Sequence, residues 1–174
     1  MSFIEHQVHR KLMHRKNFLS DRLLPFKRLF EHHAILHHTH YRTIFSDEPV
    51  APGEDRGIRL SMVEGVLEGL PIAAVIGIFA WQGAVMFLLV VCLHHYLWSK
   101  IHLEMHKPQD RFFSHWPIFE SLAVHHYLHH KYPDKNFNVV FPLADCVLGT
   151  NVPATESDIE AYRAGLPQSK ATAA

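Results

Sequence analysis

Histidine is the residue type whose number and spacing could do chemistry in this chain. There are 17 histidines among 174 residues, and they form two groups, at positions 6–40 and 94–130. No histidine lies between Tyr41 and Leu93. The neutral imidazole ring is the commonest metal-ligating side chain in proteins. A pattern this dense therefore predicts a metal site built from both ends of the chain.

The spacing of the histidines supports this interpretation, because residues three or four apart share one face of an α-helix. Most of the clusters have that spacing: His102 and His106, His126 with His129 and His130, and His33 with His37 and the adjacent His38. His95 lies two turns before His102 on the same face. His9 and His14 are five residues apart, which an ideal α-helix does not place on one face, so by geometry this pair is the weakest.

The number of candidate ligands bears on the kind of metal site. Buried imidazoles packed together need partners, and a metal ion accepts the neutral ring nitrogen as a ligand. Imidazole suits zinc, copper, iron and nickel, but a structural zinc needs only about four ligands. At least ten are available here, which favours two ions. The HExxH zinc motif is absent from the segment His102–His106, and so is the Glu-x-x-His pattern of carboxylate-bridged di-iron bundles.

The elements that position these histidines are predicted to be helical. Residues 1–45 are expected to be helix with a break at Pro25, and they carry eight basic against three acidic residues. That excess suits a segment lying against anionic headgroups on the cytoplasmic side of a membrane. Residues 46–58 and 107–117 contain prolines and are expected to be connections. Helices are predicted over 117–131 and 157–164.

An apolar segment separates the two histidine groups. Residues 70–93 carry no charge and are long enough for one bilayer crossing of about 20 residues. A single crossing would place the two groups on opposite sides of the membrane, so we favour a helical hairpin with legs at 59–79 and 84–102 and a turn near 81–83. Glu64 and Glu68 are costly in such a leg. The alternative is a soluble protein with one long buried helix.

Four histidine motifs and a closing segment resemble a known family. The motifs are HRKLMH (9–14), HHAILHH (32–38), HLEMH (102–106) and HHYLHH (125–130), followed by KNFNVVFPLADCVLGT (135–150). Together they resemble the fatty acid hydroxylase (sterol desaturase-like) superfamily of integral-membrane di-iron enzymes. The resemblance covers about residues 9–150 of a single domain spanning 1–174, with a polar tail at 151–174. It implies metal ligands at His9, His14, His33, His37, His38, His102, His106, His126, His129 and His130.

Three other histidines are alternative ligands: His125, His95 or His40 would replace or supplement one of these ten. In the closing segment, Asn136, Asn138 and Asp145 are candidates for hydrogen bonds to ligand imidazoles, or are turn and cap residues. Cys146 and Val147 stand where the family has Arg-Leu, which puts any ion pair there in doubt.

The resemblance also implies what the protein is and does. The expected fold is all-α: an integral-membrane helical protein with one apolar hairpin and a cytoplasmic-side helical cap that carries a histidine-rich dimetal site. The expected cofactors are two iron ions (Fe2+/Fe3+). The expected activity is the O2-dependent hydroxylation or desaturation of a lipid C–H bond, with electrons from an external donor of the ferredoxin, cytochrome b5 or reductase type. The rival hypothesis is a histidine-rich membrane protein that binds zinc, copper or nickel without redox turnover.

Composition excludes several other classes. The chain has 17 basic and 17 acidic residues, so its net charge gives no argument for nucleic acid as a partner. Its two cysteines, Cys92 and Cys146, form no CxxC motif and no disulfide framework. The N-terminus has no apolar stretch of the kind found in signal peptides.

Overall fold

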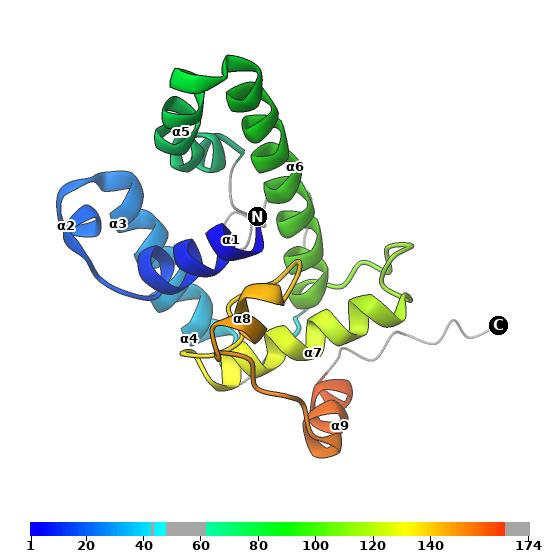
Figure 1. The fold of residues 1–174 in the computed structure, drawn as a ribbon. Coiled ribbons are helices and arrows are strands. Elements are labelled where there is room, and N and C mark those ends of the chain that lie inside the picture. The colour runs from blue at the N-terminus through cyan, green and yellow to red at the C-terminus, as the bar shows by residue number, and fades with distance from the viewer. Residues whose placement is uncertain (43, 48–61, 166–174) are drawn as a thin grey trace.

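The structure is a computed structural model that describes residues 1–42, 44–47 and 62–165. Every regular element in these ranges is helical (Figure 1). In chain order the elements are α1 (Ser2–Val8), η1 (His9–Met13), α2 (Phe18–Arg22), α3 (Leu24–Phe30), η2 (Glu31–His37), α4 (His38–His40), α5 (Met62–Phe79), α6 (Trp81–His106), α7 (Pro117–Lys131), α8 (Leu143–Val147) and α9 (Glu156–Ala164). The predicted all-α class is confirmed for these residues. The predicted loop at 46–58 lies mostly outside them.

The N-terminal region is helical as predicted, but it breaks twice. The first break, after His14, ends at Asn17, whose side chain accepts hydrogen bonds from the backbone N–H groups of Leu19 and Ser20 and so caps α2. The second break is at Leu23. Pro25 then lies in the first turn of α3, where the missing N–H costs nothing.

Two turns in this region, η1 and η2, are π-helical. In η1 the N–H of His14 donates to the carbonyl of His9 at 3.1 Å, five residues earlier. In η2 the N–H of His38 donates in the same way to His33. A π turn holds one more residue than an α turn, so residues five apart come to lie above one another. Isolated π turns in α-helices are frequent at functional sites.

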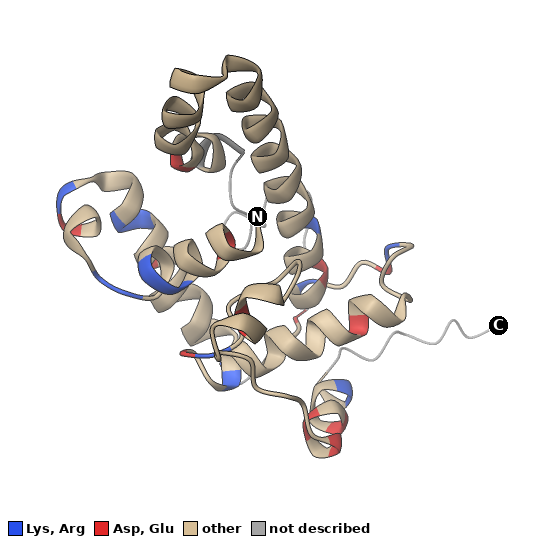
Figure 2. Cartoon of the chain, in the orientation of Figure 1, with Lys and Arg blue, Asp and Glu red and all other residues tan. Residues whose placement is uncertain are grey.

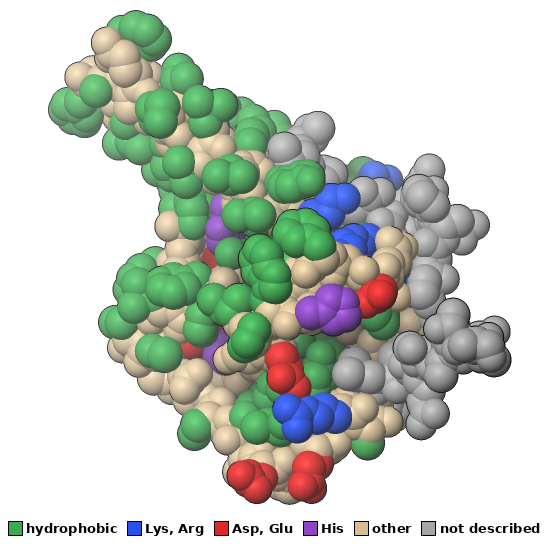
Figure 3. Space-filling model, turned by 90° about the vertical axis from the view of Figure 1, so that its right-hand side faces the viewer, with side chains coloured by type: hydrophobic (Ala, Val, Ile, Leu, Met, Phe, Trp, Pro, Cys, Tyr) green, Lys and Arg blue, Asp and Glu red, His purple; other side chains and the backbone are tan. Residues whose placement is uncertain are grey.

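The apolar segment forms the predicted hairpin, with two differences from the predicted boundaries. The legs α5 and α6 pack side by side and meet at Ala80, before the expected turn at 81–83, and α6 continues to His106. Figure 3 shows the hairpin projecting from the body with a surface made almost wholly of hydrophobic side chains. Phe79 and Ile78 near its tip are 86% and 78% exposed.

Among the described residues, one helix, α6, is long and apolar enough to cross a membrane. The other leg, α5, contributes a shorter apolar stretch, Gly65–Phe79. Only 17% of the most apolar window of α6 is buried inside the protein. The alternative of a long buried core helix therefore does not describe this segment. Apolar surface on this scale calls for a partner, such as a bilayer, outside the chain.

One close contact holds the two legs of the hairpin together at the end nearest the body. A Cβ atom on Gly65 would lie 2.5 Å from the ring of His95, whereas one on Gly77, near the tip, would lie 3.5 Å from Ala84, an ordinary contact. Gly65→Ala is therefore expected to push the legs apart and lower the stability of the detergent-solubilised protein by about 1–3 kcal/mol. Gly77→Ala is the matched control and should be neutral or slightly stabilising. Equal melting temperatures for the two variants would contradict the contact.

The body packs beneath the hairpin around α7, whose predicted bounds, 117–131, are confirmed. Phe119, Ala123 and Val124 on α7 form a core with Trp98 and Met105 of α6. The predicted polar helix is α9, which begins one residue earlier than expected and is capped by the Thr155 side chain. The segment 132–150, with α8 inside it, lies between α1 and α7 and closes the structure over the histidines (Figure 1).

Candidate metal centre

The ten histidines predicted as ligands come together in two groups of five. The first group comprises His9, His14, His33, His38 and His129, and the second comprises His37, His102, His106, His126 and His130. Within each group, one ring nitrogen of every residue lies within 4.8 Å of the others. All are buried except His14, which is partly exposed. Neither group, among the described residues, contains a carboxylate or a thiol.

The distances between ring nitrogens in the first group match those expected around a cation. Nε2 of His9 lies 2.7 Å from that of His33, and Nε2 of His129 lies 3.0 Å from His14 and 3.2 Å from His38. Two imidazoles bound at about 2.1 Å and at a right angle have nitrogens roughly 3.0 Å apart. Five nitrogens converging on one point cannot all be satisfied by hydrogen bonds to each other. The donor set therefore fits a single metal ion.

The second group has the same geometry and a further sign of a missing partner. Nε2 of His126 lies 3.1 Å from that of His106 and 3.2 Å from that of His130. Both ring nitrogens of His37 are buried without a hydrogen-bond partner among the described residues. Leaving such a group unpaired costs about 1–3 kcal/mol. A metal ion would satisfy the nitrogen that points into the group.

Backbone carbonyls hold several of these rings in the tautomer that a metal requires. Nδ1 of His129 donates to the carbonyl of Lys135 at 2.7 Å, and Nδ1 of His106 donates to that of Phe45 at 2.7 Å. Nδ1 of His9 makes a short bond to the carbonyl of Phe137. With the proton on Nδ1, the lone pair of Nε2 faces the centre of the group.

The π-helical turns explain how the motifs divide between the groups. His9 and His14, expected to be the weakest pair, lie in one group because η1 brings residues five apart together. The expectation that His33 and His37 act as an i, i+4 pair is wrong. In η2 the pair is His33 with His38, and His37 faces the other group.

The fourth motif also serves both groups. His126 and His130, one α-helical turn apart on α7, belong to the second group, whereas His129 belongs to the first. Rings of the two groups stack directly on each other, with centroids 4.4 Å apart for His38 and His130. Stacked imidazole rings therefore form the boundary between the two candidate sites.

The alternative ligands lie outside both groups. His125 bonds to the carboxylate of Asp145 at 3.2 Å, and His40 bonds to Asp47 at 3.0 Å. Nδ1 of His95 lies 3.2 Å from the carbonyl of Val91 within α6.

Four further histidines lie apart from both groups. His32 and His115 are exposed. His94 lies 3.3 Å from the Glu5 carboxylate. His6 is fully buried, and its Nε2 lies 2.8 Å from the Thr150 hydroxyl. None of the four belongs to either group.

The polar residues of the closing segment bond mainly to the backbone, so of the two predicted alternatives the structure supports turn and cap residues over hydrogen bonds to ligand imidazoles. Asp145 accepts hydrogen bonds from the N–H groups of Phe137 and Asn138 at 2.9 and 2.7 Å. The Asn136 amide donates to the carbonyls of His125 and Val152.

The Asn138 amide in turn donates to the carbonyl of Ser2 and the carboxylate of Glu5. Together these bonds fix the loop whose carbonyls, from Lys135 and Phe137, hold two histidines. Neither carbonyl could be predicted from the sequence, because every residue has a backbone oxygen and no motif identifies one that bonds to a ligand.

A pocket of about 100 Å³ lies between α1, η1 and the hairpin, and one residue of the first histidine group, His9, lines it. Its lining is mainly apolar and includes Gly69 of α5 and Phe87 and Val91 of α6. Trp98 of α6 is also in the lining. The Trp98 ring stacks on His102 of the second group at 4.2 Å. The pocket thus lies between the apolar hairpin and His9 of the first group, and Trp98 in its wall contacts the second group.

Burial keeps these imidazoles neutral. It lowers the pKa of His9, His33 and His126 well below the usual value of 6.5 and lowers the pKa of His129 to about 4. Neutral rings are the form that binds a metal.

These shifts predict a loss of stability in acid. In the unfolded chain the histidines take up protons as the pH falls through 6.5, while the buried ones do not. The unfolded state then binds more protons, so each such histidine removes up to about 1.4 kcal/mol per pH unit below 6.5, until its folded pKa is reached. The melting temperature of chelator-treated protein should fall steadily from pH 7 to pH 5. A constant melting temperature over this range would show that these rings are not buried as described.

Comparisons with known proteins returned no match to any protein-family model, any curated protein or any solved structure.

Proposed function

We propose that this protein is a membrane-bound oxidoreductase that uses O2 and two iron ions to hydroxylate or desaturate a C–H bond of a lipid. The observation that carries the proposal is the pair of adjacent five-histidine groups, together with an apolar pocket that His9 of the first group lines. The ordered histidine motifs and the closing segment, which resemble the fatty acid hydroxylase superfamily, supply the choice of iron.

The donor set supports a reactive site over a structural one. Structural zinc sites are closed by four ligands. Here ten neutral nitrogens would hold two cations, five each, without any thiolate or carboxylate from the described residues. Iron in such an all-nitrogen site would supply the oxidising power needed to remove hydrogen from an unactivated carbon.

The protein's own part is to orient the ligands, hold the substrate and exclude water. The carbonyls of Phe45, Lys135 and Phe137 orient one or more rings in each group. Burial of the rings keeps water from the reacting carbon.

The pocket supports a lipid tail as the substrate group. From Phe87 to Trp98 its lining covers about 16 Å along α6, at a rise of about 1.5 Å per residue. A hydrocarbon chain entering between the hairpin and α1 would reach His9 without crossing water. A membrane-embedded hairpin would give that chain a direct route from the bilayer.

Turnover also needs electrons. The proposal therefore includes an external donor of the ferredoxin, cytochrome b5 or reductase type, and it places the histidine cap on the cytoplasmic side, where such donors are found. The basic N-terminal region supports this orientation.

The rival function, storage or transport of zinc, copper or nickel, draws on the same imidazoles. The experiment that separates the two loads purified protein with iron in nanodiscs and measures O2 consumption with a reductase system, with and without long-chain lipid substrates. The oxidoreductase predicts lipid-dependent O2 consumption together with an oxidised lipid product. Tight metal uptake with no lipid-dependent consumption would favour the rival.

A further inference from the structure

We propose that the turn between α2 and α3 is a second membrane contact of this protein, which inserts apolar side chains beside the hairpin and binds anionic lipid headgroups. This inference concerns a surface distant from the histidine groups. It holds whether or not the protein oxidises lipid.

The turn presents large apolar side chains to the outside. Phe18 is 71% exposed, and Leu23 and Leu24 are 47% and 57% exposed. They lie within seven residues of one another, on the two short helices that meet at Leu23. Single exposed apolar residues are ordinary, but a cluster at one corner favours an apolar partner.

Basic side chains surround this corner. Residues 10–31 contain seven lysines and arginines against two acidic residues, Asp21 and Glu31, although the chain as a whole is neutral. The Arg22 guanidinium lies over the ring of Phe18 at 5.6 Å, and Lys16 pairs with Asp21 at 3.2 Å. Apolar side chains ringed by basic ones are typical of segments that lie in the interface of an anionic membrane.

The corner is rigid, so its side chains are presented in a fixed direction. The Asn17 side chain caps α2 and also donates to the carbonyls of Lys11 and Arg15. The hydroxyl of Ser20 donates to the carbonyl of Asn17. Because the turn is already ordered, insertion would not require an additional loss of chain entropy.

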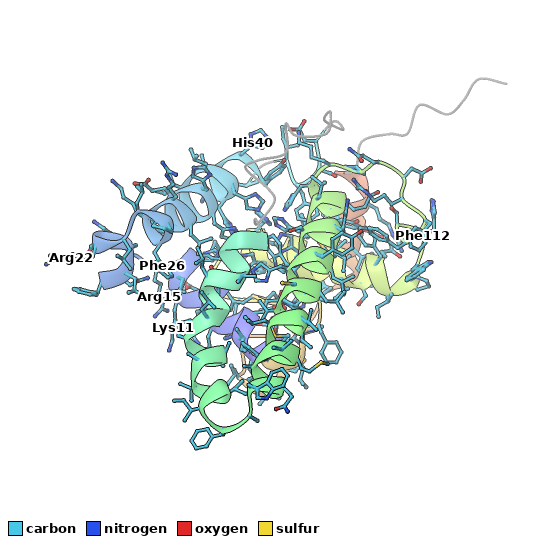
Figure 4. All side chains as sticks on the ribbon, turned by 90° about the horizontal axis from the view of Figure 1, so that it is seen from above. Lys11, Arg15, Arg22, Phe26, His40 and Phe112 are labelled. Atoms are coloured by element: carbon cyan, nitrogen blue, oxygen red, sulfur yellow. The ribbon has the colours of Figure 1, made fainter. Side chains whose placement is uncertain are left out.

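The basic side chains of the corner lie beside the hairpin. In Figure 1 the α2–α3 turn lies to the left of the hairpin and below its tip. Seen from above, Lys11, Arg15 and Arg22 lie together on one side of the hairpin (Figure 4). Figure 2 shows several acidic residues on α9, at the lower end of the molecule, away from the α2–α3 corner. The basic corner and the acidic helix α9 therefore lie in different parts of the molecule.

The test places a spin label on the corner of the full chain. In a Cys92→Ser/Cys146→Ser background, Leu24→Cys is labelled and the protein is reconstituted into phosphatidylcholine nanodiscs with or without about 30% phosphatidylglycerol. Glu160→Cys on α9 is the water-exposed reference. Collisions with O2, which concentrates in lipid, are compared with collisions with a water-soluble nickel complex. In the anionic discs we expect the label at position 24 to favour O2 and the label at position 160 to favour nickel.

Two matched variants test the role of charge. Arg15→Gln/Arg22→Gln should lower the ratio of lipid-embedded to water-exposed label at position 24 roughly thirtyfold in anionic discs. Lys131→Gln/Arg163→Gln removes the same number of charges from two exposed side chains at the α9 end and should leave the ratio unchanged. Melting temperatures of both variants control for folding.

The hairpin keeps every variant in the disc, so the reading at position 24 is local. A label at position 24 as water-exposed as the one at position 160 would overturn the proposal. Insertion of the label to the same extent in neutral and anionic discs would also overturn it. So would a label at position 24 that a short RNA shields from the nickel complex and anionic discs do not.

Discussion

Replacing His33 with alanine is expected to abolish turnover and to reduce the metal content of the purified protein from two ions per chain to one. His33 is buried, and its Nε2 lies 2.7 Å from that of His9 and 3.2 Å from that of His14. Its loss leaves the first group with one ligand nitrogen fewer, beside those of His9 and His14. Affinity at that site should fall by more than the 10- to 100-fold that is typical for the loss of a group that only orients a ligand. Metal analysis and lipid-dependent O2 consumption measure the two effects.

His32→Ala is the matched control, because His32 is the preceding residue in the same π-helical turn and is exposed. It should keep both ions and normal turnover. His106→Ala should remove the second ion in the same manner, since His106 belongs to the other group. Full activity in His33→Ala, or equal losses in His32→Ala and His33→Ala, would show that the two groups are not the metal sites.

Asp145→Ala is expected to destabilise the protein by about 3–5 kcal/mol and to weaken metal binding in the first group. The carboxylate is fully buried and accepts hydrogen bonds from two backbone N–H groups and from the Thr150 hydroxyl at 2.6 Å. Removing it leaves these donors, and His125 at 3.2 Å, without their shared acceptor. It also releases the loop whose Phe137 carbonyl holds His9. Denaturant unfolding and a metal titration measure the two consequences.

Asp134→Ala is a suitable control, because Asp134 lies in the same connection after α7 but is exposed. It should change stability by less than about 0.5 kcal/mol. Asp145→Asn keeps one oxygen as an acceptor and should fall between the two. If Asp145→Ala were as stable as Asp134→Ala, the closing segment would be held by other contacts, and its role in orienting His9 would be wrong.

The ordered histidine motifs, through the family they resemble, implied which histidines come together, and the number of neutral rings alone predicted a metal site. All ten predicted positions fall in the two groups, and His125, His95 and His40 do not. The division into groups was not predictable, because periodicity assumes α-helical turns. Two π turns changed the pairing of His9 with His14 and of His33 with His38.

The hairpin was predictable from its charge-free run and from the need to bring the histidines of residues 6–40 and those of residues 94–130 to one end. Its turn at Ala80 and the length of α6 were not, since apolar residues on either side of the turn look alike in sequence. The carbonyls that hold the rings could not be foreseen either. They depend on tertiary contacts between segments more than 60 residues apart, such as Phe45 with His106 and Phe137 with His9.

Anomalous X-ray diffraction at the iron absorption edge tests the central claim most directly, using protein loaded with ferrous iron under reducing conditions. The proposed function predicts two peaks in each chain, one at the centre of the ring nitrogens of the first group and one at the centre of the second. One peak alone, or peaks away from both groups of histidines, would contradict it.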